Sequence, residues 1–310
     1  MADDLAARAE LVKLARALGT TRDAVAFAAP LGTAGIRELR ERVVAALYDE
    51  HRAAFRRVAA ITRTLPMPVN VRITLRAFPP LLAARVAGEM APERAAEMAN
   101  RLPVEYLAES CVHLDPRRAG PLVSRLDPDR VLAVVAELVD RGDFVTLGRL
   151  LDAASEQLLA HLAAAISDVA LLRIGCYAES GAQLSRAVGV LTPERLRGIV
   201  HTAVTGPADL RAAGLAMIGR LDDPALCGRL AEYAAEEPDE VLTAVLRTAL
   251  DEGAVGELLG AVTAMGEQAR RRVVGLPALD DEATRTRLVT AAADLGLLPT
   301  LAPLDALRGS

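Results

Sequence analysis

Aromatic residues are scarce in this sequence. It has no tryptophan, and only four tyrosines and four phenylalanines occur among its 310 residues. Sites that stack nucleobases depend on aromatic rings, and nucleic-acid-binding proteins are usually basic, whereas this chain has a net charge of −5. A nucleic-acid partner is therefore not expected. Alanine, leucine and valine supply the apolar mass, which favours closely packed helices over strands, so we expect an all-α fold.

Cysteine and lysine are also rare. Cys111, Cys176 and Cys227 show no metal-ligand spacing, and their odd number argues against a disulfide framework. We expect them to be small buried residues in a reducing compartment. Lys13 is the only lysine, a bias that we attribute to a GC-rich genome rather than to function.

Uninterrupted apolar runs are missing. The most apolar window, residues 158–178, is broken by His161, Asp168 and Arg173 and carries too much charge for a transmembrane helix. The amino terminus has acidic residues where a signal peptide has basic ones. We therefore expect a cytoplasmic protein that does not insert into membranes.

Catalytic motifs are missing as well. The sequence has no P-loop, no GxGxxG loop and no GxSxG elbow, and none of its four histidines, which we expect to be partly exposed, belongs to an HExxH pair. The doublets Asp222–Asp223 and Asp280–Asp281 could bind magnesium–diphosphate, as in the all-helical terpenoid synthases. Both lie at predicted helix starts, however, and are better explained as caps. We assign no catalytic residue, cofactor or metal ligand, although dispersed active-site residues would leave no motif.

The N-terminal portion, residues 1–75, is predicted to hold three helices. The first is capped by Asp3 or Asp4, and a short second helix ends near Pro30. Apolar residues spaced by three, four or seven positions predict one long helix over residues 35–65. Four of its residues are expected to face inward: Leu47, Ala54, Val58 and Ile61.

A twelve-residue spacing dominates residues 76–180. The apolar residues that recur at this interval are Phe78, Met90, Leu102, Leu114, Leu126, Leu138 and Leu150. Asp115 and Asp127 stand where helix N-caps are expected, each before a proline. Each unit leaves about eight helical residues, which are too few to be stable alone, so the helices must stack. The expected result is one continuous buried seam formed by Leu102, Leu114, Leu126 and Leu138.

Residues 181–310 repeat less strictly. Helices are predicted to begin at Thr192–Pro193, Gly206–Pro207, Asp223–Pro224, Glu237–Pro238 and Asp280 or Asp281. These pieces are long enough for helical hairpins of the HEAT type. A weak boundary is expected between Ser180 and Leu191, within what is predicted to be one continuous superhelix.

Three segments share a pattern of turn, proline and short helix: Pro92-Glu93-Arg94-Ala95, Leu114-Asp115-Pro116-Arg117-Arg118-Ala119 and Leu126-Asp127-Pro128-Asp129-Arg130-Val131. With their surroundings, residues 78–150, they resemble the cytoplasmic N-terminal domain of MgtE magnesium channels. The resemblance implies a superhelix of short helices, related to those of the flagellar rotor protein FliG and of armadillo and HEAT arrays. The CBS and membrane domains of the channels have no counterpart here, so no magnesium ligand is carried over.

Charge is distributed unevenly. Residues 35–85 hold ten arginines and four acids, a net charge of +6, whereas residues 222–257 hold ten acids and two arginines, a net charge of −8. Spacings of four and seven put Arg52, Arg56 and Arg63 near one helix face. With Arg57, they are the candidate partner-binding residues.

We expect a non-enzymatic helical-repeat scaffold that binds a partner protein. The arginine-rich segment favours an acidic partner. Two alternative functions stay open: a small-molecule binder or enzyme with an apolar pocket between helices, and a phosphate or nucleic-acid binder that uses the arginines. The arginines could also be mere solvated surface that pairs locally with Glu38, Glu41, Asp49 and Glu50. The sequence leaves the oligomeric state open.

Overall fold

In a computed structural model of the chain, every regular element of the described residues is a helix, as the composition predicts. The structure describes residues 5–300, apart from the side chain of Tyr48, so the expected cap at Asp3 or Asp4 lies outside it. Contacts divide the chain into two units. The N-terminal unit comprises residues 12–166 and 177–179, and the C-terminal unit comprises the described parts of residues 1–11, 167–176 and 180–310.

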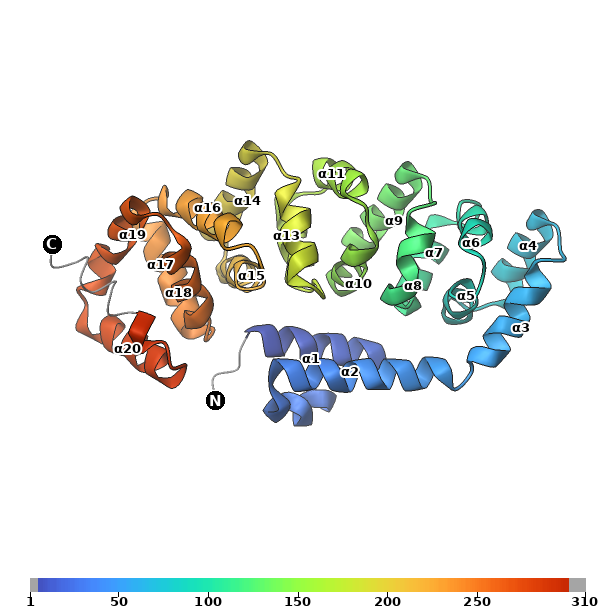
Figure 1. Cartoon of the computed structure of the whole chain (residues 1–310), viewed down its shortest axis with the longest axis horizontal. Coiled ribbons are helices and arrows are strands. Elements are labelled where there is room, and N and C mark those ends of the chain that lie inside the picture. Colours follow the sequence, from blue (N-terminus) through green and yellow to red (C-terminus); the bar gives the residue numbers. More distant parts are fainter. Residues whose placement is uncertain (1–4, 301–310) are drawn as a thin grey trace. The chain divides into compact units, whose positions relative to one another are not determined.

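The first helix, α1 (Leu5–Leu18), contributes residues to both units. The other helices of the N-terminal unit, with η denoting a 3-10 helix, are η1 (Asp23–Leu31), α2 (Gly32–Asp49), α3 (Arg52–Thr62), α4 (Met67–Ala77), α5 (Pro80–Ala87), α6 (Pro92–Ala99), α7 (Val104–His113), α8 (Pro116–Val123), α9 (Pro128–Asp140), α10 (Phe144–Leu150), η2 (Leu151–Ala153) and α11 (Glu156–Ala165) (Figure 1). Helices α5 to α9 begin at twelve-residue steps, as the spacing predicts. The caps are confirmed, because the Asp115 and Asp127 carboxylates accept hydrogen bonds from backbone N–H groups two residues later.

Helices of the N-terminal unit pack mainly against the helix two places further along the chain. One series runs from α3 through α5, α7 and α9 to α11, and the other runs from α4 through α6 and α8 to α10. This lateral packing supplies the stability that a helix of eight residues lacks in isolation. The leucines of successive units therefore belong to different series.

The predicted single seam of leucines is not observed. Leu102, Leu114 and Leu138 are buried, whereas Leu126 is only half-buried. Leu102 packs in a cluster with two methionines, and Leu114 packs in a separate cluster with two alanines. Twelve-residue spacing fixes where helices begin, but alternation between two series puts the leucines in separate parts of the core.

The long helix predicted over residues 35–65 is two helices. Helix α2 ends at Asp49 and α3 begins at Arg52, because α2 packs against η1 whereas α3 packs against α5. The break shifts the buried face of the second segment, where Ala59 and Thr62 point inward.

The change of phase overturns an expectation about the inward face. Leu47, Ala54 and Ile61 are exposed, and Val58 is half-buried. The prediction of one helix treats the apolar periodicity as continuous, but α2 and α3 share no common face across the break between them.

The C-terminal unit contains α12 (Asp168–Gly175), α13 (Gly181–Gly189), α14 (Pro193–Thr205), α15 (Ala208–Ile218), α16 (Pro224–Ala235), α17 (Asp239–Asp251), α18 (Val255–Ala264), α19 (Glu267–Val274), η3 (Pro277–Leu279) and α20 (Glu282–Asp294). The predicted helix starts agree with these bounds to within two residues. Side chains of Thr192, Asp223 and Asp281 accept hydrogen bonds from first-turn N–H groups, which confirms the capping role of the second aspartate in each acidic doublet. Val255, Leu259 and Ala292 belong to a large buried cluster of this unit.

Among residues 5–300, no helix combines the length and apolar character that crossing a bilayer requires.

A buried ionic cluster joins α1, α2 and α10 within the N-terminal unit. Glu179 accepts hydrogen bonds from Arg40 Nη2 at 2.6 Å and from Lys13 Nζ at 3.4 Å, and Arg149 Nε lies 4.0 Å from its second oxygen. Lys13, the only lysine, is fully buried, and both arginines are less than 10% exposed. Buried cations are costly unless they are paired, and the Glu179 carboxylate contributes negative charge to cations from three helices.

Replacing Glu179 by Gln should therefore destabilise the protein strongly. The substitution keeps the shape but removes a negative charge that three buried cations share, a loss of about 3–5 kcal/mol in unfolding free energy. Chemical denaturation measures it. Glu38→Gln is the matched control, because Glu38 forms an exposed pair with Arg42 four residues away and should cost less than about 0.5 kcal/mol. Equal stability of the two variants would contradict the role of Glu179.

Candidate functional site

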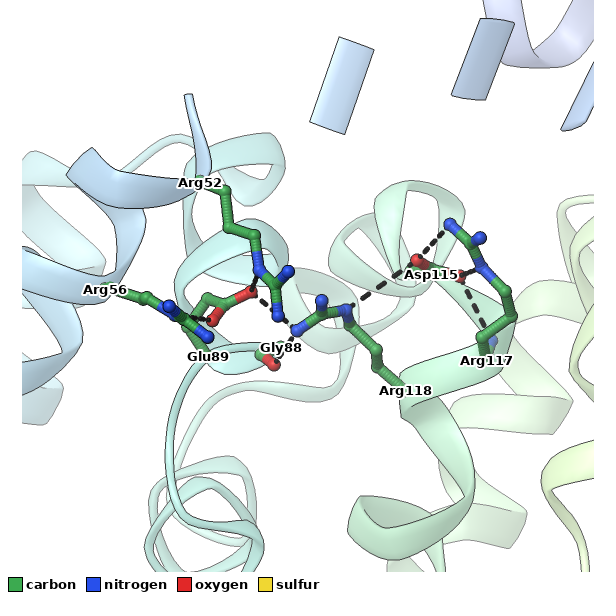
Figure 2. A network of polar contacts seen from close by, with 7 residues as sticks. All are labelled: Arg52, Arg56, Gly88, Glu89, Asp115, Arg117 and Arg118. Carbon is green, nitrogen blue, oxygen red and sulfur yellow. Dashed lines mark hydrogen bonds and ion pairs between the residues drawn. The ribbon is translucent and has the colours of Figure 1, made fainter. Parts of the chain in front are cut away.

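Two of the four candidate arginines converge on one acidic side chain. Arg52 and Arg56, one turn apart on α3, each direct their Nε atom at Glu89, with N–O distances of 3.0 Å (Figure 2). Glu89 lies in the turn between α5 and α6, and its side chain is only 4% exposed. A nearly buried carboxylate thus fixes the orientation of two arginines at the surface.

A third arginine reaches Glu89 from the opposite side. Arg118 of α8 donates from Nη1 to Glu89 Oε1 at 2.6 Å and to the Gly88 carbonyl at 3.0 Å (Figure 2). Its Nε lies 3.8 Å from Asp115. Arg118 therefore connects the arginines of α3 to the cap of α8.

Asp115 is held by its neighbour Arg117. The Arg117 side chain donates two hydrogen bonds, from Nε and Nη2, and its backbone N–H donates a third. Burial of Asp115 opposes ionisation, but these hydrogen bonds and the charges of Arg117 and Arg118 together lower its pKa below the ordinary value. The pKa of Arg117 is raised, first by its hydrogen bonds to Asp115. Both groups are charged at neutral pH.

The network carries an excess of positive charge. Four arginines face two carboxylates among the side chains drawn in Figure 2. Arg52 and Arg56 use only Nε in their hydrogen bonds, and their side chains are 39% and 63% exposed. Their terminal Nη groups are therefore available to an external acceptor while the stems are already held in place.

The other two candidates, Arg57 and Arg63, are exposed and make no ion pair within the described residues. They lie in residues 51–88, a stretch that contains seven arginines and no acidic residue. Arg72 and Arg76 on α4 are likewise exposed without an ionic partner in the structure between residues 5 and 300. The surface of α3 and α4 thus contains cations that the described chain does not neutralise.

Local pairing of the α3 arginines with α2 is not what the structure contains. Glu38 pairs with Arg42, whereas Arg52 and Arg56 pair with Glu89. Sequence reasoning missed Glu89 and Arg118. A signal was present for Glu89, which is the only acid between Glu50 and Glu93.

A separate cavity of about 400 Å³ lies within the N-terminal unit. It is lined by Arg16, Pro79, Pro80, Leu81, Glu109, Val112, His113, Leu138, Arg141 and Asp143. Its charged groups are mutually paired, with Arg16 bonded to Asp143 and Arg141 lying 3.7 Å from Glu109. The pKa of His113 is lowered, first because its half-buried ring loses hydration and then because nearby arginines repel its charged form.

The cysteines are free thiols that are half-buried rather than fully buried as expected. Burial raises the pKa of the Cys111 thiol to about 12 and that of the Cys176 thiol to about 11. Both are therefore protonated at neutral pH, the unreactive form of a thiol. Within residues 5–300, no three His, Cys, Asp or Glu side chains cluster in a way that could hold a metal ion.

Comparison of the chain with protein-family models, with curated proteins and with solved structures finds no match. The resemblance of residues 78–150 to the N-terminal domain of MgtE channels therefore stays a prediction.

Replacing Glu89 by Gln should destabilise the protein by about 1–3 kcal/mol, because three guanidinium groups lose the nearly buried charge that holds them together. The loss should be smaller than for Glu179, since these arginines can turn toward water. Thermal and chemical unfolding measure it. Glu97→Gln is the control: its pair with Arg101 is half-exposed on both sides and should cost less than about 0.5 kcal/mol. An unchanged free energy of unfolding for Glu89→Gln would show that Glu89 does not hold the three arginines together.

Because of His113, the free energy of unfolding should decrease as the pH is lowered below neutrality. Its pKa in the folded protein lies below the ordinary 6.5, so the unfolded chain binds the proton more readily, and stability is lost as pH falls through 6.5. Unfolding free energies between pH 7.5 and 5.5 should decline less for His113→Gln than for the unaltered protein. Parallel curves for the two proteins would exclude this contribution.

Proposed function

We propose that the chain is a non-enzymatic α-helical scaffold, a superhelical array of stacked helices, that binds an acidic segment of a partner protein through the arginines of α3 and α4. The observation that carries this proposal is the set of exposed arginines without ionic partners, next to two arginines whose stems are fixed by Glu89. The packing of each helix against the helix two places along supports the array.

Guanidinium groups suit carboxylates in particular. Each presents N–H groups in a planar fork that can bind a carboxylate with two parallel hydrogen bonds. Arg52 and Arg56 already have their Nε atoms engaged, so less side-chain entropy is lost when their Nη groups bind a second anion. The fixed arginines supply geometry, and the unpaired Arg57 and Arg63 supply additional charge.

A protein partner is favoured over a nucleic acid. Single-stranded nucleic acid is bound by stacking on aromatic rings, whereas α4 exposes aliphatic side chains and α3 has one aromatic residue, the half-buried Phe55. The net charge of the chain, −5, would also repel a polyanion outside this one region. An acidic protein segment needs only a local basic surface.

The sharpest test reverses Arg57 and Arg63 to Glu. Neither forms an intramolecular ion pair, so the double variant should fold with unchanged stability, unlike a reversal of Arg52 or Arg56, which would set two carboxylates against each other at Glu89. Proteins captured from a lysate of the source cells by the unaltered chain should be lost by this variant. Their capture should also weaken as salt rises, because exposed charges are screened over about 8 Å at physiological ionic strength.

Reversal of Arg186 and Arg229 to Glu is the matched control, since both are exposed arginines of the C-terminal unit without an ion pair in the described chain. A captured set that is equally affected by both double variants would contradict a role of the α3 surface. Recovery of nucleic acid in place of an acidic protein would favour the alternative function.

A further inference from the structure

Helix α4 has its apolar and polar faces in an unusual arrangement. Its buried residues are Met67, Asn70 and Thr74. The side chains of Val69, Ile73 and Leu75, by contrast, are each at least 40% exposed. A surface helix ordinarily turns its aliphatic residues toward the core, so α4 exposes what most helices bury.

Hydrogen bonds account for this orientation. Asn70 Nδ2 donates to the Thr62 carbonyl at 2.8 Å and to the Leu65 carbonyl at 3.2 Å. Arg94 of α6 donates to the same two carbonyls at 2.6 and 2.7 Å. Thr62 ends α3 and Leu65 lies in the segment that follows. The inward face of α4 therefore carries the side chain that, together with Arg94, satisfies the carbonyls of this turn.

The outward face carries a regular stripe. Val69, Arg72, Ile73 and Arg76 follow one another at the i, i+3, i+4 and i+7 positions that lie along one side of a helix. The stripe thus alternates aliphatic side chains with arginines that have no ionic partner in the described chain. Ile61, which lies near the end of α3 and shortly before α4 in the sequence, is also 60% exposed.

Helix α4 is also the first member of its packing series. In the part of the chain that the structure describes, α6 is the helix that α4 contacts substantially, and the series continues from there to α8 and α10. Figure 1 shows α4 beside α3 and α6 within this unit. Terminal helices of stacked arrays are usually polar on the outside, whereas this one offers a stripe suited to a further helix.

We infer that the outer face of α4 binds an amphipathic helix of a partner protein, with an aliphatic stripe of its own flanked by aspartate or glutamate. The inference rests on the proposed function and specifies the form of the acidic segment. Val69 and Ile73 would contact the aliphatic stripe of the partner helix, and Arg72 and Arg76 would pair with its flanking acids. The lack of acids over residues 51–88 excludes a basic partner by repulsion.

The probe is a synthetic peptide of about 18 residues, long enough to form a helix, with leucines at i, i+3, i+4 and i+7 and glutamates beside them. A second peptide has the same composition in an order that makes no stripe. Fluorescence anisotropy should show that the striped peptide binds the full chain about tenfold more tightly than the scrambled one. Binding of the striped peptide should weaken as salt rises.

Two double variants locate the site. Val69→Ser with Ile73→Ser should weaken binding of the striped peptide about tenfold or more, because the contact loses its apolar centre. Arg72→Glu with Arg76→Glu should abolish it. All four residues are exposed, so both variants should fold, as circular dichroism would verify. Controls are Val289→Ser, which is 41% exposed on α20, and Arg186→Glu; neither should change the affinity by more than about twofold.

Three results would overturn the inference. The first is equal binding of the striped and scrambled peptides, lost only when Arg57 and Arg63 are reversed. This result would agree with binding of an acidic segment but would exclude docking of a helix on α4. The second is a failure of both peptides to bind although the arginine-dependent capture of a partner protein persists. This result would also exclude docking of a helix while leaving the proposed function intact. Binding to vesicles with anionic lipid in place of the striped peptide would assign the stripe to a membrane surface instead.

Discussion

Helices of eight residues cannot hold their own shape in water, and this constraint governs the N-terminal unit. Helices α5, α6 and α8 each have this length. Their stability must come from side-by-side packing with the helices two places along the chain. Such packing leaves α4, the first helix of its series, without a preceding helix of that series. The exposed stripe lies on this helix, whose inward face is held by the hydrogen bonds of Asn70.

Two buried carboxylates give this unit its specific geometry. Glu179 gathers Lys13, Arg40 and Arg149 in the interior, and Glu89 gathers Arg52, Arg56 and Arg118 near the surface. In each case one negative charge fixes cations from at least two helices. Such clusters add little net stability compared with apolar packing, but removing the shared carboxylate is costly. They therefore define which helices lie together more than how strongly they do so.

The two clusters differ in how far their cations are exposed to water. Around Glu179 the cations are buried, and their charge is available to no external group. Around Glu89, Arg52 and Arg56 make their ion pairs through Nε and are 39% and 63% exposed, next to other arginines without ionic partners in the described chain. The same chemistry therefore forms an internal tie in one place and, in the other, a surface with exposed arginine groups, on which the proposed binding of an acidic segment rests. Exposure alone makes the difference, since a guanidinium in water can exchange its hydration for a carboxylate at low cost.

Local chemistry in the sequence determined the class of fold and the starts of many short helices, although not the break between α2 and α3. A proline can begin a helix but not continue one, and an aspartate or threonine before it satisfies the first free N–H groups, so helix starts such as those of α8, α9, α14 and α16 could be read directly. The basic character of α3 was equally visible. Only tertiary structure decided the phase of the buried faces, because the break between α2 and α3 and the packing of α3 against α5 leave Ile61 exposed. It also decided that Glu89, Arg118 and Glu179 meet their partners across 29 to 166 residues of sequence, since no local pattern records which distant helix will supply a counter-charge.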